Sequence, residues 1–485
     1  MRPRLGWVQP YVRSTFGPTP ADQNGTWVLV HDLLEQIVDA GIAESIDVFA
    51  EDPAQVQRHW RERRMSGRTE HELVVHHLET LPTRCATAPL LFIQQHVATA
   101  GLGAARSSGA RLGICSFVNT INLTLQPYID ALIWGSVEDS IVVTSAAAEK
   151  TVRSLFDTAS ALIRESVGTH EKTAPSLLSV PLGVDCGQLS PLERSVARDI
   201  LGLPRSDDIV LYMGRVSQDD KGDLLPLLDV LEALATTRPS VRLVIAGQID
   251  DDNRRRLTAR VGDGLPLGRI TVIPNFAQFT KRVILSAADV FVSPVDNVQE
   301  TFGLSVLEAM AAGLPVVASD WSGYRDLVVP GKTGFLVPTT WDARCLNWAS
   351  LALPLIGSGR TRQLLARTTV VDTEVLYRNL LLLLTRPDLA RAMGEAGRER
   401  VVRDYDWPVV IGRLGEAWTH QWNQICSSRP AVRPSVRLVE AVGHFATRTS
   451  GTSTDGVLTG DADGLTGVAE RMIEMKGRRM SERRP

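Results

Sequence analysis

The chain has 485 residues, of which 44% are hydrophobic and 22% are charged, and its formal net charge is −3. A chain of this length exceeds one ordinary hydrophobic core, so we expect two or three domains with the composition of a soluble globular protein. The nearly balanced charge gives no support for a nucleic-acid partner.

The N-terminal segment MRPRLGWVQPYV is charged but has no apolar signal core after it. No uninterrupted apolar run approaches the roughly 20 residues that a bilayer span needs. The scattered cysteines argue against a disulfide framework or a zinc site and fit a reducing compartment; they are Cys85, Cys115, Cys186, Cys345 and Cys426. We therefore expect a cytoplasmic protein without an integral membrane segment.

Short apolar runs alternate with longer stretches of helical period along most of the chain. A first series of runs lies at 5–8, 46–50, 90–94, 112–115, 141–144 and 177–180, and a second lies at 209–213, 241–247, 270–273, 289–293 and 315–319. Their continuous apolarity indicates strands that are covered on both faces. Strands that alternate with helices predict βαβ units, so the expected fold class is α/β with doubly wound parallel sheets.

The series restarts after PLGVDCGQLSPLERS, which is rich in Gly, Pro and Ser and is typical of a linker. It should end in a helix start, with Ser190 as N-cap, Pro191 at the first helical position and Glu193 closing a capping box. We therefore predict two domains, at 1–180 and 181–405.

A closing helix is expected at 406–426, where Ile411, Leu414, Trp418 and Trp422 share one face, as in a packed core helix. The segment 427–485 is low in large apolar residues and should be a disordered tail. Its terminal arginines could make weak peripheral contact with an anionic membrane, although a solvated tail is favoured.

The strongest chemical signal is NVQETFGLSVLEAMAAGLPVV, after the run at 289–293. Ligands of open α/β sheets bind beyond the carboxyl ends of strands, so the loop 295–301 should line a site. A helix from Leu304 to Ala312 should leave the amides around Phe302, Gly303 and Leu304 free for an anion such as a phosphate.

Two carboxylates flank these amides. Glu300 could accept hydrogen bonds from sugar hydroxyls, and Glu308 could hold a second diol such as a ribose. The alternative is that Glu308 is an ordinary exposed helix residue and Glu300 a charge that solubilises a loop.

A second constellation, GRVSQDDKG, follows the run at 209–213. Gly214 precedes Arg215, which can chelate phosphate oxygens, and Lys221 adds a compact charge. Together the two cations could clamp a diphosphate and neutralise it as a leaving group. Taken alone, an arginine and a lysine at a strand end are more often solvated loop charges.

These motifs together resemble the retaining glycosyltransferases of family 4, which have the GT-B fold and a glycosyl transferases group 1 domain. The matching residues are Gly214-Arg215, Lys221-Gly222, the two-glutamate segment from Glu300 to Asp326, GKTGFLVP at 331–338, PLGVD at 181–185 and RDYDWPVVI at 403–411. The resemblance covers 181–425 well and the first domain weakly. It implies two Rossmann-like domains that face across a cleft, with the last helix crossing back onto the first domain.

The resemblance also implies roles for these residues. Glu300 would bind the donor sugar, with the amides of Phe302, Gly303 and Leu304 on sugar and phosphate oxygens. Glu308 would take the ribose hydroxyls, while Arg215 and Lys221, beside Gly214, would stabilise the departing diphosphate. The family retains anomeric configuration and uses no metal or other cofactor, so we interpret Asp250, Asp251 and Asp252 as an acidic helix start.

The first domain departs from this pattern. Paired glycines are absent after the first strand, and Asn119 stands where many relatives have a histidine near the reacting sugar. Asn119, on the acceptor side, can donate a hydrogen bond but cannot transfer protons as a histidine does. This difference puts acceptor handling in doubt.

The leading hypothesis is a hexosyltransferase that uses a nucleotide-diphosphate sugar and a glycosyl acceptor that the sequence does not identify. One alternative is a catalytically impaired, glycosyltransferase-like binding protein, which Asn119 favours. Another is a GT-B disaccharide synthase or phosphorylase.

Overall fold

The computed structural model describes residues 2–9, 25–65, 71–84, 90–93, 112–118, 121, 124–168, 174–217, 221–249, 251–262, 269–277, 279–296, 300–342, 344, 364–366 and 368–427. The acceptor-side Asn119, the first aspartate of the acidic triplet and the tail beyond Ser427 lie outside these residues. Three cysteines fall within them, and none of the three forms a disulfide.

The first domain is built on a seven-stranded sheet of order β3-β2-β1-β4-β5-β6-β7, in which every pairing is parallel. Its strands are β1 (Arg4–Gln9), β2 (Ser45–Ala50), β3 (Val74–His77), β4 (Leu90–Ile93), β5 (Gly113–Val118), β6 (Ser140–Val143) and β7 (Ser176–Ser179). The helices that accompany them are α1 (Gly25–Ala40), α2 (Pro53–Met65), α3 (Leu81–Arg84), α5 (Gln126–Trp134) and α6 (Ala146–Val167). Strand order and direction are those of a doubly wound domain.

The second domain has a six-stranded parallel sheet of order β10-β9-β8-β11-β12-β13. Its strands are β8 (Asp208–Met213), β9 (Val241–Gly247), β10 (Ile270–Pro274), β11 (Val290–Ser293), β12 (Val316–Ser319) and β13 (Gly334–Val337). Its helices are α7 (Arg194–Leu201), α8 (Leu225–Thr237), α9 (Asp251–Gly262), α10 (Thr280–Ala287), α11 (Leu304–Ala311), α12 (Tyr324–Leu327), α14 (Thr373–Thr385) and α15 (Pro387–Asp404). A short antiparallel pair, β14 (Thr339–Trp341) and β15 (Thr369–Val371), stands apart from this sheet.

Strand order in the second sheet reverses between β8 and β11. Because chain connections leave the sheet in opposite directions from these two neighbours, their carboxyl ends border the crevice in which doubly wound domains bind ligands. The cationic motif follows β8 and the glutamate loop follows β11, so the topology brings the two predicted motifs to one place.

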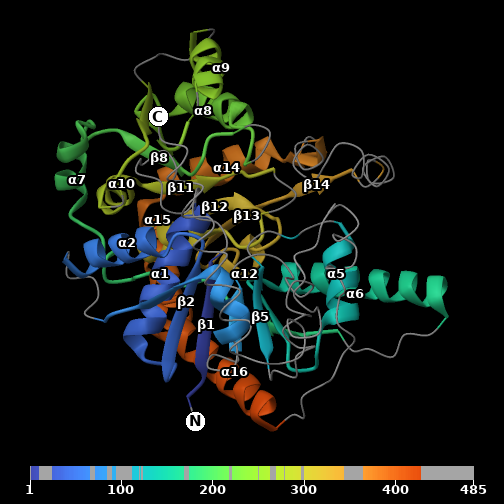
Figure 1. Cartoon of the computed structure of the whole chain (residues 1–485). Helices are drawn as coiled ribbons and strands as arrows, with labels where there is room; N and C mark the ends of the chain where they lie inside the picture. The colour runs from blue at the N-terminus through green and yellow to red at the C-terminus, as the bar shows by residue number, and fades with distance from the viewer. Residues whose placement is uncertain are drawn as a thin grey trace, which may run out of the picture.

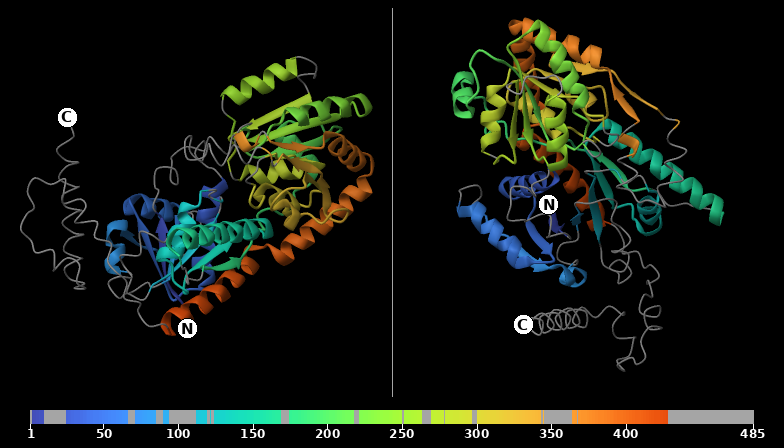
Figure 2. Two further views of the ribbon diagram at one scale, coloured as in Figure 1. Left: turned by 90° about the vertical axis from the view of Figure 1, so that its right-hand side faces the viewer. Right: turned by 90° about the horizontal axis from the view of Figure 1, so that it is seen from above.

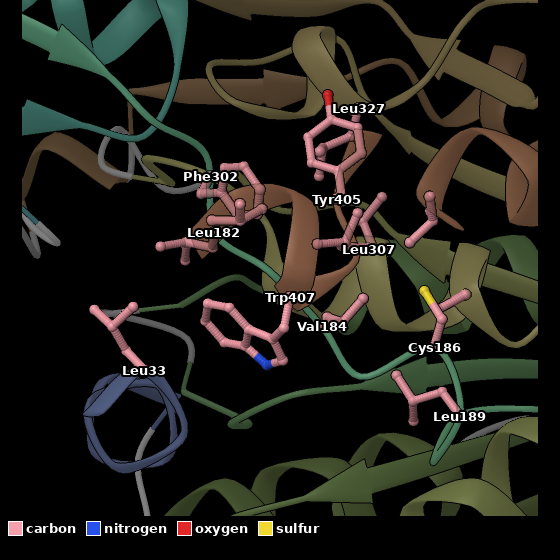
Figure 3. Close-up of a cluster of buried hydrophobic side chains, with 14 of the residues drawn as sticks. Leu33, Leu182, Val184, Cys186, Leu189, Phe302, Leu307, Leu327, Tyr405 and Trp407 are labelled. Carbon is pink, nitrogen blue, oxygen red and sulfur yellow. The ribbon is translucent and has the colours of Figure 1, made fainter. Parts of the chain in front are cut away.

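The two domains share an apolar joint where the chain crosses between them (Figure 3). Leu182 and Val184 on the linker pack with Trp407, and Leu33 on α1 belongs to the same buried cluster. Gly183 lies so close to the Trp407 ring that a side chain at this position would come within 2.4 Å of it. Two backbone bonds, Val184 N to Tyr405 O at 3.0 Å and Trp407 N to Val184 O at 3.1 Å, tie the outgoing and returning chains together.

The last helix, α16 (Trp407–Ser427), runs back along the first domain (Figures 1 and 2). All four residues of the predicted stripe are buried: Ile411, Leu414, Trp418 and Trp422. Gln421, which is also buried, donates to the carbonyls of Ile114 and Glu138 at 3.2 and 2.7 Å. The predicted crossover is therefore confirmed.

The predicted α/β class with two doubly wound sheets is confirmed, and every predicted strand is present within a few residues of its expected bounds. The strands β3, β13, β14 and β15 were missed. The acidic start of α9 is confirmed, with Asp251 and Asp252 in its first turn. Among the described residues, no helix combines the length and apolarity that a membrane crossing requires.

The predicted start of α7 is wrong. Glu193, not Ser190, is the N-cap, and its carboxylate accepts hydrogen bonds from the amides of Ser195 and Val196. The physical reason is tertiary: α10 holds the preceding segment, because Arg282 Nε donates to Ser190 O at 2.5 Å and Ser286 Oγ accepts from Leu192 N at 2.9 Å.

We expect Trp418→Ala to destabilise the first domain by about 3–5 kcal/mol, the usual cost of emptying a large buried aromatic site. Trp418 is fully buried, packs edge-on against Phe92 and donates to Cys115 Sγ at 3.3 Å. Urea unfolding followed by circular dichroism measures the change. The matched control is Asn423→Ala on the exposed side of α16, and equal midpoints for the two variants would contradict the packing role.

Candidate functional site

The site is assembled at the carboxyl ends of β8 and β11. Gly214, which follows β8, donates to Ala246 O at 2.9 Å, and the neighbouring strand ends at Gly247 with φ of 146°. A side chain at Gly247 would come within 1.9 Å of Gly214 O. The close approach of the two backbones therefore requires glycine at position 247, and the exposed Arg215 follows directly after Gly214.

Glu300 is buried, with 8% of its surface exposed, and its Oε2 accepts from Lys221 Nζ in an ion pair. The predicted cation and the predicted sugar-binding carboxylate, which are far apart in sequence, therefore meet. The view of Glu300 as a solubilising loop charge is wrong, because a buried carboxylate needs a partner that offsets its lost hydration.

The backbone around Glu300 is held by close packing. Gly323 N lies 3.4 Å from Glu300 O, and a side chain at Gly323 would come within 2.5 Å of both Thr301 O and the Phe302 Cα. Gly303 adopts φ of 105°, and a side chain there would lie 2.3 Å from the Tyr324 ring. Glycine is required at Gly303 for both conformation and space.

Gly303 is also the N-cap of α11 and offers no side chain to the first-turn amides. These amides carry the positive end of the helix dipole and suit an anionic ligand oxygen. The predicted helix start at Leu304 is confirmed, and α11 ends at Ala311.

Glu308 projects from α11 and is 7% exposed, so its interpretation as an ordinary exposed helix residue is wrong. Its Oε1 accepts from Lys281 Nζ on α10 at 2.5 Å, and both side chains are 10% exposed. Lys281 was not predicted as a site residue, because no local spacing relates it to Glu308. Only the packing of α10 beside the carboxyl end of the sheet brings the two together.

Buried phenols lie beneath the glutamate loop. The Tyr324 hydroxyl is 2.7 Å from Ser293 Oγ, and the Tyr212 hydroxyl donates to Arg215 O at 3.2 Å. Burial raises the pKa of Tyr324 well above its ordinary range, and the nearby charge of Glu300 raises that pKa further. The phenols beneath the glutamate loop are therefore uncharged but polar.

Asp296, just beyond β11, is a further acid that the sequence analysis did not single out. Its Oδ1 accepts from Asp223 N at 3.1 Å, and burial raises its pKa to about 6. Asp223 also stands close enough for its charge to add to this rise. Asp296 is therefore a group of this site that changes charge close to neutral pH.

The site presents two kinds of group side by side: positive groups that suit a polyanion, and acceptors that suit a polyol. Arg215, Lys221 and the α11 amides supply positive potential, while Glu300 and Glu308 supply acceptors for hydroxyl groups. Within the residues that the structure describes, no three His, Cys, Asp or Glu side chains converge as metal ligands would.

Residues 193–353 match the family described as glycosyl transferases group 1. The phosphatidyl-myo-inositol mannosyltransferase of Mycobacterium tuberculosis is 32% identical over 245 residues, which are 50% of this chain and 54% of that protein. The chain thus spans about half the length of the curated relatives it matches. All the residues of the two predicted motifs lie inside the family match.

Solved structures resemble nearly the whole described fold. Sucrose-phosphate synthase from Thermosynechococcus elongatus is 20% identical with a TM-score of 0.59, covering 87% of this chain and 100% of that one. Anabaena HepE in complex with UDP and glucose is 15% identical with a TM-score of 0.57, covering 86% and 99%. These likenesses confirm the predicted GT-B fold.

We expect the stability of Asp296→Asn to differ from that of the parent protein in a pH-dependent way. With its pKa raised from 3.8 to about 6, Asp296 binds a proton more readily in the folded than in the unfolded chain. Its stabilising contribution is therefore present below pH 4 and is lost as the pH rises to 6. The asparagine amide cannot ionise, so above pH 6 the variant should be more stable by up to about 3 kcal/mol.

Urea midpoints of both proteins between pH 4 and 8 measure this difference. Asp157→Asn, on the exposed face of α6, is the control and should show no such pH trend. A constant difference between Asp296→Asn and the parent across the range would contradict the prediction.

The Lys281–Glu308 pair predicts strong coupling. Lys281→Met should cost about 3–5 kcal/mol of stability, because it leaves a buried carboxylate without its partner. The double variant Lys281→Met/Glu308→Gln should recover a large part of that loss. A double-mutant cycle on the free energy of unfolding measures the coupling, and simple additivity would show that the two groups do not depend on each other.

Proposed function

We propose that the chain transfers a hexosyl group from a nucleoside-diphosphate sugar to an acceptor hydroxyl, because residues 193–353 match the glycosyl transferases group 1 family. The observation that carries the proposal is the meeting of Lys221 with the buried Glu300 beside the α11 amides. A cation, helix-terminal amides and a carboxylate at the carboxyl ends of two neighbouring strands match the parts of a sugar diphosphate.

The donor would bind with its diphosphate between Arg215 and the start of α11. Glu300 would accept hydrogen bonds from the sugar, and Glu308, held by Lys281, would present its second oxygen to the ribose diol. A nucleotide donor is supported by HepE, whose structure holds UDP and glucose on the same fold.

The proposed reaction breaks the bond between the sugar C1 and the diphosphate oxygen, and the electron pair passes to the diphosphate. The acceptor oxygen attacks C1 from the same face, which retains the configuration, and its proton passes to the departing oxygen. Arg215 and Lys221 would stabilise the charge that develops on the leaving group, so the chemistry requires no metal ion. Retention and metal independence follow from the family resemblance.

A glycosyltransferase-like binding protein without catalysis is the second candidate. Asn119, where relatives have a histidine, favours it. The donor-binding groups that the enzyme needs, Lys221 and Glu300, are both present and in contact, which favours the enzyme. Calorimetry with nucleotide sugars and a transfer assay distinguish the two candidates, since a binding protein would bind donor without turnover.

The donor can be identified by thermal shift against UDP-, GDP-, ADP- and dTDP-sugars, because a ligand that binds only the folded state raises its stability. With that donor, Glu300→Gln should lower kcat/KM by about 10²-fold or more, the usual effect of losing one preorganised polar contact. Binding of the free nucleoside diphosphate should change little.

Glu395→Gln, an exposed carboxylate on α15, is the control and should be as active as the parent protein. Full activity of Glu300→Gln would exclude the sugar-binding role of this residue. Absence of any shift with all four donors would exclude these nucleotide sugars as donors.

A further inference from the structure

The Glu300 loop contacts not only its own domain but also the first domain. The carbonyl of Thr301, the residue after Glu300, accepts a hydrogen bond from Ser145 Oγ at 2.6 Å. Ser145 stands between β6 and α6 and is 3% exposed, while Thr301 is 9% exposed. A buried hydrogen bond therefore crosses the domain boundary one residue from the carboxylate to which we assign donor binding.

Ser145 also caps its own helix, because its Oγ accepts from Ala148 N at 3.1 Å. One hydroxyl thus accepts from α6 and donates to the Glu300 loop, so it acts as acceptor and donor at once. Any hydroxyl or carboxylate could cap the helix, but only a group with a proton can donate to the Thr301 carbonyl. These two capacities can be separated by substitution.

A second contact lies beside the first. Ala146 N, in the first turn of α6, donates to Asp326 Oδ2 on α12 at 2.7 Å. α12 lies at the border between the two domains (Figure 1). Asp326 O in turn accepts from Arg400 and from the Tyr405 hydroxyl, at 2.8 and 3.1 Å. The N-terminus of α6, which favours negative charge, therefore takes one cap from the opposite domain.

We infer that Ser145 is a positioning residue, which fixes the Glu300 loop from across the domain boundary by its hydrogen bond to the Thr301 carbonyl. The inference rests on the proposed function for its catalytic consequence but not for its structural one. Within the second domain, Gly323 packs closely against the backbone of Thr301 and Phe302, and the first domain adds the hydrogen bond from Ser145. When this hydrogen bond is lost, the Glu300 loop should move, and the donor sugar should no longer be aligned for transfer.

The test uses Ser145→Asp in the 485-residue chain. Aspartate is a good N-cap and keeps the acceptor for Ala148 N, but when ionised it has no proton to donate and places a charge against the Thr301 carbonyl. Ser145→Thr keeps both the acceptor for Ala148 N and the donor to the Thr301 carbonyl, so this variant should behave like the parent protein. Thr158→Ala, on the exposed side of the same helix, is the matched control.

Two readouts separate this inference from the proposed function. Hydrogen–deuterium exchange of the peptide 300–307 should be at least about threefold faster in Ser145→Asp and unchanged in Ser145→Thr and Thr158→Ala. With the donor identified above, Ser145→Asp should lower kcat at least about tenfold, while the Kd of the free nucleoside diphosphate changes less than about threefold. A general loss of structure would instead lower kcat, raise the Kd of the free nucleoside diphosphate and lower the melting temperature.

If the parent protein transfers no sugar, the proposed function fails, and the exchange measurement still decides the role of Ser145. Unchanged exchange in the 300–307 peptide of folded Ser145→Asp would overturn the inference. So would equal damage by Ser145→Thr, because the hydroxyl proton would then not be what matters. Asp326→Ala should give a smaller change in exchange, since its contact is exposed to solvent.

Discussion

The burial of two carboxylates at the end of one sheet is the constraint on which this molecule depends. Glu300 and Glu308 are each less than one-tenth exposed, and an unpaired charge at such a depth would be strongly destabilising. Each is matched by a lysine from a different element: Lys221 from the loop after β8 and Lys281 from α10. The reversal of strand order between β8 and β11 brings the first pair together, and the packing of α10 brings the second pair together.

The glutamate loop belongs to the site and to the apolar joint between the domains at the same time. Phe302 packs with Tyr405 at a ring distance of 6.3 Å and lies in the cluster that contains Trp407 (Figure 3). Residues that carry the chain between the domains therefore also support the backbone next to Glu300. Substitutions in this cluster should affect stability and ligand binding together.

The domain boundary combines two kinds of contact. The joint around Leu182 and Trp407 is apolar and continuous with the cores of both domains, whereas the contacts of α6 with Thr301 and Asp326 are single hydrogen bonds. Apolar burial is strong and non-directional, while a hydrogen bond that exchanges with water contributes little net free energy but defines a direction. The first kind holds the domains together, and the second can specify where a loop lies.

The features of this protein that depend on local pattern could be predicted from its amino-acid sequence. Continuous apolar runs identified the two parallel sheets, the stripe from Ile411 to Trp422 identified the crossover helix, and glycines beside Glu300 and Arg215 marked the two strand ends of the site. The interaction partners of buried groups became apparent only in the tertiary structure. Lys281 pairs with Glu308, and Ser145 donates a hydrogen bond to the Thr301 carbonyl. Helix α10 binds the backbone at Ser190, which the sequence predicts to be a helix N-cap. Periodicity and capping act within a few residues, whereas a buried charge or carbonyl takes its partner from whatever the fold brings near, and no local spacing records that choice.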